Sequence, residues 1–336
     1  MLWRYRGDQE FASALANMTQ YPQPLVAIVI LTWNQRDLTL DCLASLAEMN
    51  YPADHLQIIV VDNGSRDDTV PAIHSRFPYV TVLENGDNLG FAAGNNVGIR
   101  HALLGPAEYI MLLNNDTVVD RQMLRELLTA LAGQPDVGVV GPKMLYFDRP
   151  DVFWCAGNRV NWRTGGTIRL QAEQLDVDSD EQPYEVDFIT ACAICLRRQV
   201  IEQIGVLDPR FFIYYEETDW CTRARAVGWR IQYVPRARLW HKVSAAMGTT
   251  SPATDYYMNR NMLLFLSKNL RALSRARALA FAAGRNLLAV AVYTVKSHDG
   301  RRTPNRNARL FALRDAILGR WGKMGSDVAR VCYPSR

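Results

Sequence analysis

The chain has 336 residues, of which 49% are hydrophobic, 21% charged and 10% aromatic, as expected of a globular protein with one large core or two modest ones. Ordinary glycine and proline usage and the lack of a fixed-period repeat exclude collagen-like, disordered and solenoid classes. Six scattered cysteines do not make a disulfide scaffold, and the first residues, MLWRYRGDQE, hold no apolar leader, so we expect a cytoplasmic protein.

The net charge of +4 hides an asymmetry along the chain. From Lys268 onward, 15 basic residues face three acidic ones, whereas the preceding residues carry a net charge of −8. A basic tail on an acidic body predicts an anionic partner, either a nucleic acid or the inner face of a membrane.

In the first half of the chain, apolar runs of strand length alternate with segments of helical period. The predicted strands are 25–31, 56–62, 79–84 and 108–116, and the predicted helices are 37–49, 67–77, 91–104 and 120–133. Strands that are apolar throughout and alternate with helices predict a doubly wound α/β fold with a mainly parallel sheet.

Small polar or acidic residues follow each of these strands. They are Thr32 to Asn34, Asp62 to Ser65, Asn85 to Asn88, and Asn114 to Asp116. Turns favour the same residue types, but their recurrence at four strand ends predicts a shared ligand cleft, where such sheets bind ligands.

The motifs GxGxxG after the first strand, GxxxxGK[ST] and HExxH are absent, which argues against dinucleotide binding, P-loop hydrolysis and zinc proteolysis. Asp62 is placed to bind a ribose or a base, and Asp116 to bind a divalent cation with substrate phosphates completing its shell. The structural alternative for Asp116 is a cap on the helix that follows.

The second half has one dense stretch, residues 207–241, in which Glu216, Glu217 and Asp219 lie among aromatic residues. Desolvation and mutual repulsion suit one of these acids to act as a general base, but a helix N-terminus also favours such a cluster. His241 follows Trp240 at a predicted strand end and is a candidate metal ligand. Cys192 and Cys195 lie in an apolar run and are interpreted as core.

Together, the segments IVILTWNQRD (28–37), VDNGSRDDT (61–69), NLGFAAGNN (88–96), LLNNDTVVD (112–120), FFIYYEETDWCTRARAVGW (211–229) and the pair Trp240-His241 resemble glycosyltransferase family 2. The resemblance is greatest to its bacterial rhamnosyltransferase branch and implies a GT-A fold. It runs from about residue 25 to about residue 270. Two departures stand out, since Asn114 replaces the first acid of the DxD-type motif and Glu217 replaces the usual aspartate.

The resemblance implies roles for individual residues. The implied nucleotide-sugar positions are Thr32, Asn34, Asp62, Asn88, Gly94, Asn95, Asn114 and Asn115. Asp116 and His241 match the metal-binding positions for Mn²⁺ or Mg²⁺, and Glu217 matches the catalytic base, with Glu216 beside it and Asp219 in the same cluster. For acceptor binding we select Trp154, Asp187 and Trp220, with Trp162 as a further candidate.

The implied reaction is inverting transfer of a sugar from a dTDP-rhamnose-like or UDP-sugar donor to a hydroxyl of a glycan or polyprenyl-linked acceptor, in cell-surface polysaccharide synthesis. The alternatives are a sugar nucleotidyltransferase, whose basic glycine-rich loop is lacking, and a catalytically silent relative. We expect an N-terminal extension (1–24), a GT-A domain (25–265) with a nucleotide-binding half (25–141) and an acceptor-binding half (142–265), and a basic helical extension (266–336).

Residues 278–295 are apolar except for Arg285 and Asn286, and basic residues follow them. This pattern predicts an interfacial helix on the anionic inner membrane face better than a spanning one. Packing on the catalytic domain or a homo-oligomer contact is the alternative, and no nucleic acid is expected.

Overall fold

The computed structural model describes residues 23–177, 182–243, 251–295 and 303–333. Nearly all of the predicted N-terminal extension, 1–24, lies outside the described residues. The predicted parallel sheet is present, with its strands in the spatial order β4-β1-β2-β3. These strands are β1 (Val26–Thr32), β2 (Leu56–Asp62), β3 (Thr81–Glu84) and β4 (Tyr109–Asn114).

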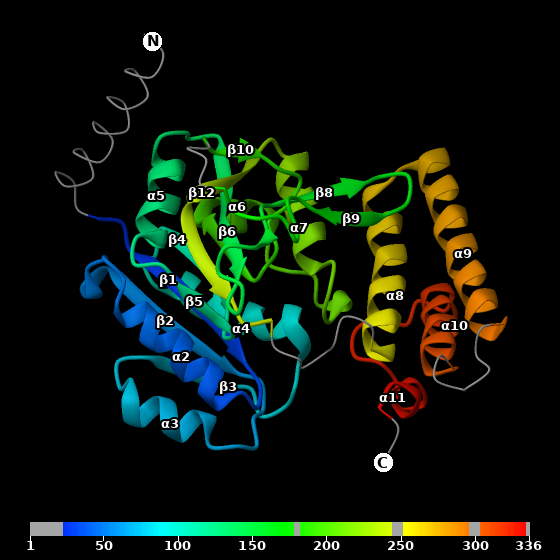
Figure 1. Ribbon diagram of the computed structural model, residues 1–336, viewed down its shortest axis with the longest axis horizontal. Coiled ribbons are helices and arrows are strands. Elements are labelled where there is room, and N and C mark those ends of the chain that lie inside the picture. Colours follow the sequence, from blue (N-terminus) through cyan, green and yellow to red (C-terminus); the bar gives the residue numbers. More distant parts are fainter. Residues whose placement is uncertain (1–22, 178–181, 244–250, 296–302, 334–336) are drawn as a thin grey trace, which may run out of the picture.

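Helices cover both faces of this sheet (Figure 1). They are α2 (Arg36–Ala47), α3 (Thr69–Arg76), α4 (Gly90–Leu104) and α5 (Met123–Ala132), with the short 3-10 turn η1 (Ala53–His55) before β2. Helix α4 packs closely on β1 and β2 because Gly98 faces them, where a Cβ atom would lie 2.3 Å from Val29 Cγ1. The apolar strands are therefore buried on both sides, as predicted.

The second half extends the same sheet in the order β10-β12-β6-β11-β4. Strand β11 is antiparallel to β4, and β12 is parallel to β6. The strands are β6 (Val137–Tyr146), β10 (Tyr184–Glu185), β11 (Ala193–Arg197) and β12 (Arg230–His241), with β5 (Thr117–Val119) on β12 and β7 (Phe153–Cys155) on β6. The predicted boundary between the halves, 141/142, falls inside β6.

Outside the sheet, β8 (Asn158–Asn161) and β9 (Gly166–Arg169) form a separate hairpin. Helix α6 (Arg198–Ile204), the 3-10 turn η2 (Pro209–Phe211) and helix α7 (Glu216–Ala226) connect β11 to β12. All six cysteines are free and buried, and burial raises the pKa of the Cys195 thiol to about 12. This agrees with the interpretation of Cys192 and Cys195 as core residues.

The C-terminal helices stand together beside the sheet domain (Figure 1). They are α8 (Pro252–Asn269), α9 (Ala272–Val295), α10 (Thr303–Ile317) and α11 (Ser326–Cys332). The predicted boundary at 265/266 falls inside α8, whose central residues are buried against the sheet domain. By length and composition alone, α9 would suffice to cross a membrane, and only 17% of its most apolar stretch is buried.

Candidate active site

Asp62 lies at the carboxyl end of β2 with one carboxylate oxygen engaged and the other free. Its Oδ2 accepts hydrogen bonds from the backbone N–H groups of Gly64 (3.1 Å) and Ser65 (3.0 Å). Its Oδ1 is buried and has no hydrogen-bond partner among the described residues. A buried carboxylate oxygen without a donor is costly, so this atom is suited to accept a hydrogen bond from a ligand.

Asn63, the next residue, holds the loops of the donor side together. It is one of the polar residues that follow this strand in the sequence, but no role of its own was predicted for it. Its Nδ2 donates to Asn88 Oδ1 and to the Gly90 carbonyl, each at 3.2 Å, and its Oδ1 accepts from Asn85 Nδ2 at 3.0 Å. Asn88 Oδ1 also accepts from the Gly90 N–H. Its position inside the motif VDNGS was the signal available in the sequence.

The loops after β1 and β2 are joined by Asn34. Asn34 adopts a positive φ of 53°, its N–H donates to Ser65 Oγ, and its Oδ1 accepts from the Arg66 N–H at 2.7 Å. An open pocket lined by residues 34–38, 67 and 68 lies at this edge of the sheet. Asn34 is therefore placed beside Asp62, as the ligand-cleft prediction requires.

Several predicted nucleotide positions have internal contacts instead. Asn115 is buried, and its Nδ2 donates to Thr32, Gln35 and Thr39. Asn95 Nδ2 bonds the carbonyl of Phe91, one turn earlier in α4. At Gly94 a Cβ atom would lie 2.6 Å from Leu31 Cδ1.

Thr32, Gly94, Asn95 and Asn115 are thus engaged in contacts within the protein. The backbone of Asn114 bonds Cys192 and Thr117, which fixes the position of the following acid, Asp116.

Asp116 and His241 form a buried pair. His241 Nε2 lies 3.1 Å from Asp116 Oδ1, and both side chains are 8% exposed. The Lys242 N–H donates to the Asp116 carbonyl, and β5 pairs with β12 at this point, which holds the two residues together. The Trp154 ring meets the His241 ring edge-on at 4.4 Å, so the predicted acceptor residue Trp154 does border this pair.

A carboxylate beside an imidazole is a donor set that Mn²⁺ or Mg²⁺ accepts. His241 Nδ1 is buried without a hydrogen-bond partner among the described residues, which leaves a nitrogen available for further bonding. No third His, Cys, Asp or Glu joins the two within the part of the chain that the structure describes. The residues therefore fit a sparse metal site that a ligand's phosphates would complete.

Glu216 and Glu217 begin α7, directly after a strained loop. Phe212, Tyr214 and Tyr215 all have positive φ values, between 64° and 72°. Asn261 of α8 holds this loop, since its Nδ2 donates to the carbonyls of Phe211, Ile213 and Tyr214 at 2.7 to 2.9 Å. Strained backbone next to a site persists only where the surroundings enforce it, and α8 provides that enforcement.

The two glutamates differ in how readily they ionise. Burial raises the pKa of both carboxyls, and the neighbouring charge of Glu217 raises that of Glu216 further. Backbone N–H groups at the start of α7 offset part of the rise for Glu217. One oxygen of Glu217 is buried without a partner, and the side chain borders an apolar cavity beside Trp220. Glu217 is therefore the acid of the pair that ionises first.

Strand β7 links Glu217 indirectly to the Asp116–His241 pair. Trp154 of β7 contacts His241, and its neighbour Cys155 lies near enough to Glu217 for that carboxylate to raise the pKa of the thiol. The structure thus brings the predicted base and the predicted metal ligands to one region of the molecule.

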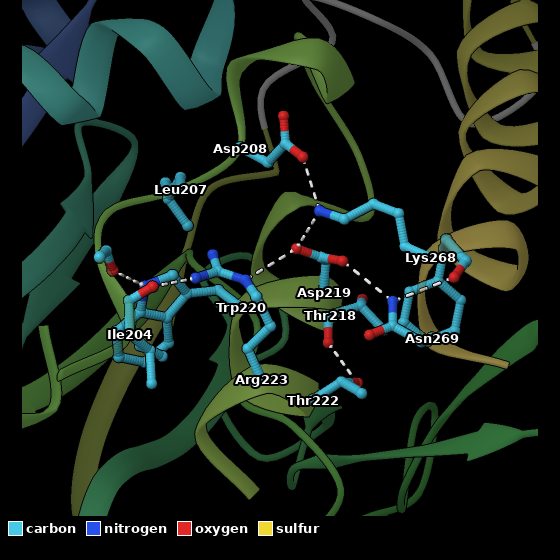
Figure 2. Close-up of polar contacts among 12 residues, drawn as sticks. Ile204, Leu207, Asp208, Thr218, Asp219, Trp220, Thr222, Arg223, Lys268 and Asn269 are labelled. Atoms are coloured by element: carbon cyan, nitrogen blue, oxygen red, sulfur yellow. Dashed lines mark hydrogen bonds and ion pairs between the residues drawn. The ribbon is translucent and has the colours of Figure 1, made fainter. Parts of the chain in front are cut away.

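Asp219 does not join this region. Figure 2 shows it among Arg223, Lys268 and Asn269, and its side chain is completely buried. Lys268 bridges Asp219 to Asp208. These contacts occupy the carboxylate, so Asp219 ties α7 to α8 rather than facing a substrate.

Two of the acceptor candidates are also occupied internally. Trp220 is 2% exposed, and its Nε1 donates to the Gly205 carbonyl. Asp187 accepts from Arg225, Arg159 and the Val160 N–H. Trp162 stacks on Phe265 at 5.4 Å, on the hairpin β8–β9. Trp154 is therefore the candidate that the structure brings to the site.

The chain belongs to glycosyltransferase family 2, because the model of the family described as glycosyltransferase like family 2 matches residues 22–262. It is 24% identical over 250 residues to the dTDP-rhamnosyl transferase RfbF of Shigella flexneri, covering 72% of this chain and 79% of that protein. It is 27% identical over 234 residues to the N-acetylglucosaminyl-diphospho-decaprenol L-rhamnosyltransferase of Mycobacterium tuberculosis, covering 63% and 75%. This family membership removes the nucleotidyltransferase alternative.

Solved structures support the GT-A fold. The mannosyltransferase PcManGT from Pyrobaculum calidifontis, in complex with GDP-Man and Mn²⁺, matches with a TM-score of 0.55 and 17% identity over 93% of this chain and 94% of that one. S. aureus TarS 1-349 in complex with UDP-GlcNAc matches with a TM-score of 0.56 and 16% identity over 87% and 81%. The predicted fold class is confirmed.

Proposed function

We propose that this protein is an inverting, metal-assisted glycosyltransferase that moves a deoxyhexosyl group from a dTDP- or UDP-sugar to a hydroxyl of a lipid-linked acceptor. The observation that carries the proposal is that β7 links the half-buried Glu217, an acid of raised pKa, to the Asp116–His241 pair through Cys155 and Trp154. The names of the two rhamnosyltransferase relatives support the choice of donor and acceptor classes.

In this proposal Glu217 removes the proton from the acceptor hydroxyl as its oxygen bonds to the anomeric carbon. The bond from that carbon to the donor diphosphate breaks, and the nucleoside diphosphate leaves from the opposite face, which inverts the configuration. A cation held by Asp116 and His241 would supply positive charge for the departing diphosphate. Asp62 Oδ1 accepts a hydrogen bond from the nucleoside, and Glu216 keeps its proton beside the base.

Calorimetric titration with dTDP, UDP and GDP, each with Mn²⁺ and with EDTA, tests this proposal. We expect one nucleotide to bind, and to bind at least tenfold more weakly in EDTA. Binding of none of the three would overturn the assignment. Asp116→Asn should remove the effect of Mn²⁺ on nucleotide binding. Asp120→Asn, four residues later and just before α5, should leave that effect unchanged.

The second part of the proposal is that the C-terminal helices rest on an anionic membrane surface. Helix α9 packs on α8 and α10 through one face, with Ala278, Ala282 and Asn286 buried. Its other face exposes apolar side chains, namely Leu273, Phe281, Leu287, Leu288, Val292 and Val295. Because α9 packs on α8 and α10 through one face, it is suited to lie in the interface rather than to cross the bilayer.

Vesicle flotation tests the membrane contact. We expect the protein to float with phosphatidylglycerol-containing vesicles more than with phosphatidylcholine alone, and the double variant Phe281→Asp, Leu288→Asp to float at least fivefold less. A matched double change on exposed apolar residues elsewhere, Leu104→Asp and Val227→Asp, should have no effect. The proposal would be contradicted if the protein floated equally with both kinds of vesicle and the α9 double variant floated as well as wild type.

A further inference from the structure

Arg169, the last residue of β9, carries an unpaired guanidinium beside the site. Its side chain is exposed, and its Cζ lies 5.3 Å from the centroid of the Trp154 ring. The same Trp154 ring contacts His241, with the ring centroids 4.4 Å apart. Within the described ranges, no side-chain hydrogen bond or ion pair of Arg169 is found.

Several other arginines of the same half are engaged. Arg149 pairs with Glu173, Arg225 and Arg159 pair with Asp187, and Arg230 pairs with Glu185 and Asp136. Glu173 is close enough to Arg169 for their charges to interact, but its carboxylate already binds Arg149 and the Tyr146 hydroxyl. Arg169 is thus distinguished by a fixed position over an aromatic ring and by free donors.

The hairpin that carries Arg169 is anchored between the strained loop and α8. The Gly165 carbonyl accepts from the Tyr215 hydroxyl at 2.9 Å, and Gly165 packs against Met262 and Leu266. Trp162 stacks on Phe265. Figure 1 shows the hairpin running from the sheet domain toward α8 and α9. The hairpin thus connects α8, through its turn, with the Trp154 side of the site, where Arg169 lies.

A guanidinium held on an indole face with free donors matches the oxygens of a phosphoryl group. The donor's diphosphate would bind at the Asp116–His241 pair, which also borders Trp154, so Arg169 on the same ring is placed to bind a second phosphoryl group next to it. We infer that Arg169 binds the phosphate of a prenyl-diphosphate-linked acceptor, an inference that rests on the proposed glycosyltransferase function.

Titration of the full-length protein with farnesyl diphosphate, at saturating dTDP or UDP and Mn²⁺, tests this inference. We expect wild type to bind it, Arg169→Gln to bind it at least tenfold more weakly, and Arg169→Lys to fall between, since lysine cannot bind in a bidentate manner. Arg76→Gln is the matched control, because Arg76 also lies over an aromatic ring, Phe77, at 5.6 Å. Farnesol measures the contribution of the apolar chain and should bind all variants equally.

Three results would overturn the inference. They are no binding of farnesyl diphosphate to wild type, equal binding to Arg169→Gln, and weaker nucleotide binding in Arg169→Gln, which would assign the residue to the donor. The thermal unfolding midpoint of each variant shows that it is folded. Nucleotide binding by wild type is measured in the same samples, so failure of the proposed function is seen separately.

Discussion

The donor side and the base side of this molecule are held together in different ways. At the donor side, neutral amides and hydroxyls, such as those of Asn63, Asn34 and Thr32, form hydrogen bonds between loops that follow strands of one parallel sheet. At the base side, residues of α8 bind residues that precede them by about 50 positions: Asn261 binds the strained loop and Lys268 binds Asp219. The donor site is thus built by the sheet itself, whereas the base depends on helices beyond it.

The largest effect expected on the base side is from Glu217→Gln. Because the amide cannot accept the acceptor's proton, we expect kcat to fall about 10³-fold, within the range for a general base, while the nucleotide Kd stays within twofold. Glu126→Gln is the matched control, since burial also raises the pKa of Glu126 but it lies in α5. Near-normal turnover by Glu217→Gln would remove it as the base.

Asp219→Ala tests the connection between α7 and α8. Removing a completely buried carboxylate leaves Arg223 without its carboxylate partner and leaves Lys268 paired only with Asp208, so we expect a loss of about 3–5 kcal/mol of unfolding free energy. Urea denaturation measures this change. Asp136→Ala, which removes an exposed ion pair with Arg230, should cost about 0–1 kcal/mol. Equal costs would show that the buried network is not stabilising.

Asn261→Ala tests the strained loop. Three backbone carbonyls lose the hydrogen bond from Asn261, so we expect the loop to relax and kcat to fall about 10- to 100-fold with nucleotide binding unchanged. Asn259→Ala, on the same helix but bonded to Asp255 and Arg309, is the control. If both variants lose activity equally, the effect belongs to the helix and not to the loop.

Asp62→Asn tests the donor side alone. Asparagine can still accept from Gly64 and Ser65 through its oxygen, but it presents an N–H group where Asp62 presents a free oxygen. We expect about a tenfold weaker nucleotide Kd, with kcat at saturating donor changed less than twofold. Asp54→Asn, exposed just before the other end of β2, should change neither. If Asp62→Asn lowered kcat but left the nucleotide Kd unchanged, the separation of a donor-binding side from a base side would be contradicted.

The pH dependence should follow the base side. Since burial raises the pKa of Glu217, its carboxyl holds a proton at pH values where an ordinary glutamate is ionised, and the protonated form cannot act as a base. At saturating substrate we expect kcat to rise with pH by up to tenfold per unit and then to level off. A rate that is flat from pH 5 to pH 8 would contradict the assignment.

The fold was predictable because strands that are apolar throughout, such as 25–31 and 56–62, have a clear pattern. The places of Asp62 and His241 at strand ends, and of Asp116 just after β4, were also predictable from the pattern, while their roles stay predictions. Asp219 was not, because side chains two positions apart on a helix point about 200° apart, so Asp219 faces away from Glu217. Asn261 left no signal, since its partners lie some 50 residues earlier. The burial of Trp220 and the ion pairs of Asp187, which argue against acceptor binding by either residue, could not be predicted from the local sequence pattern.

The packing of the C-terminal helices has a practical consequence for shortened versions of this protein. Removing the chain from Pro252 onward would eliminate the exposed apolar face of α9, but Asn261 and Lys268 would go with it. A cut after Asn269 would keep both, yet it would expose Tyr256, whose hydroxyl bonds Asp315 of α10 in the intact protein. To improve solubility, the exposed apolar residues of α9 should therefore be replaced one at a time while the full chain is retained.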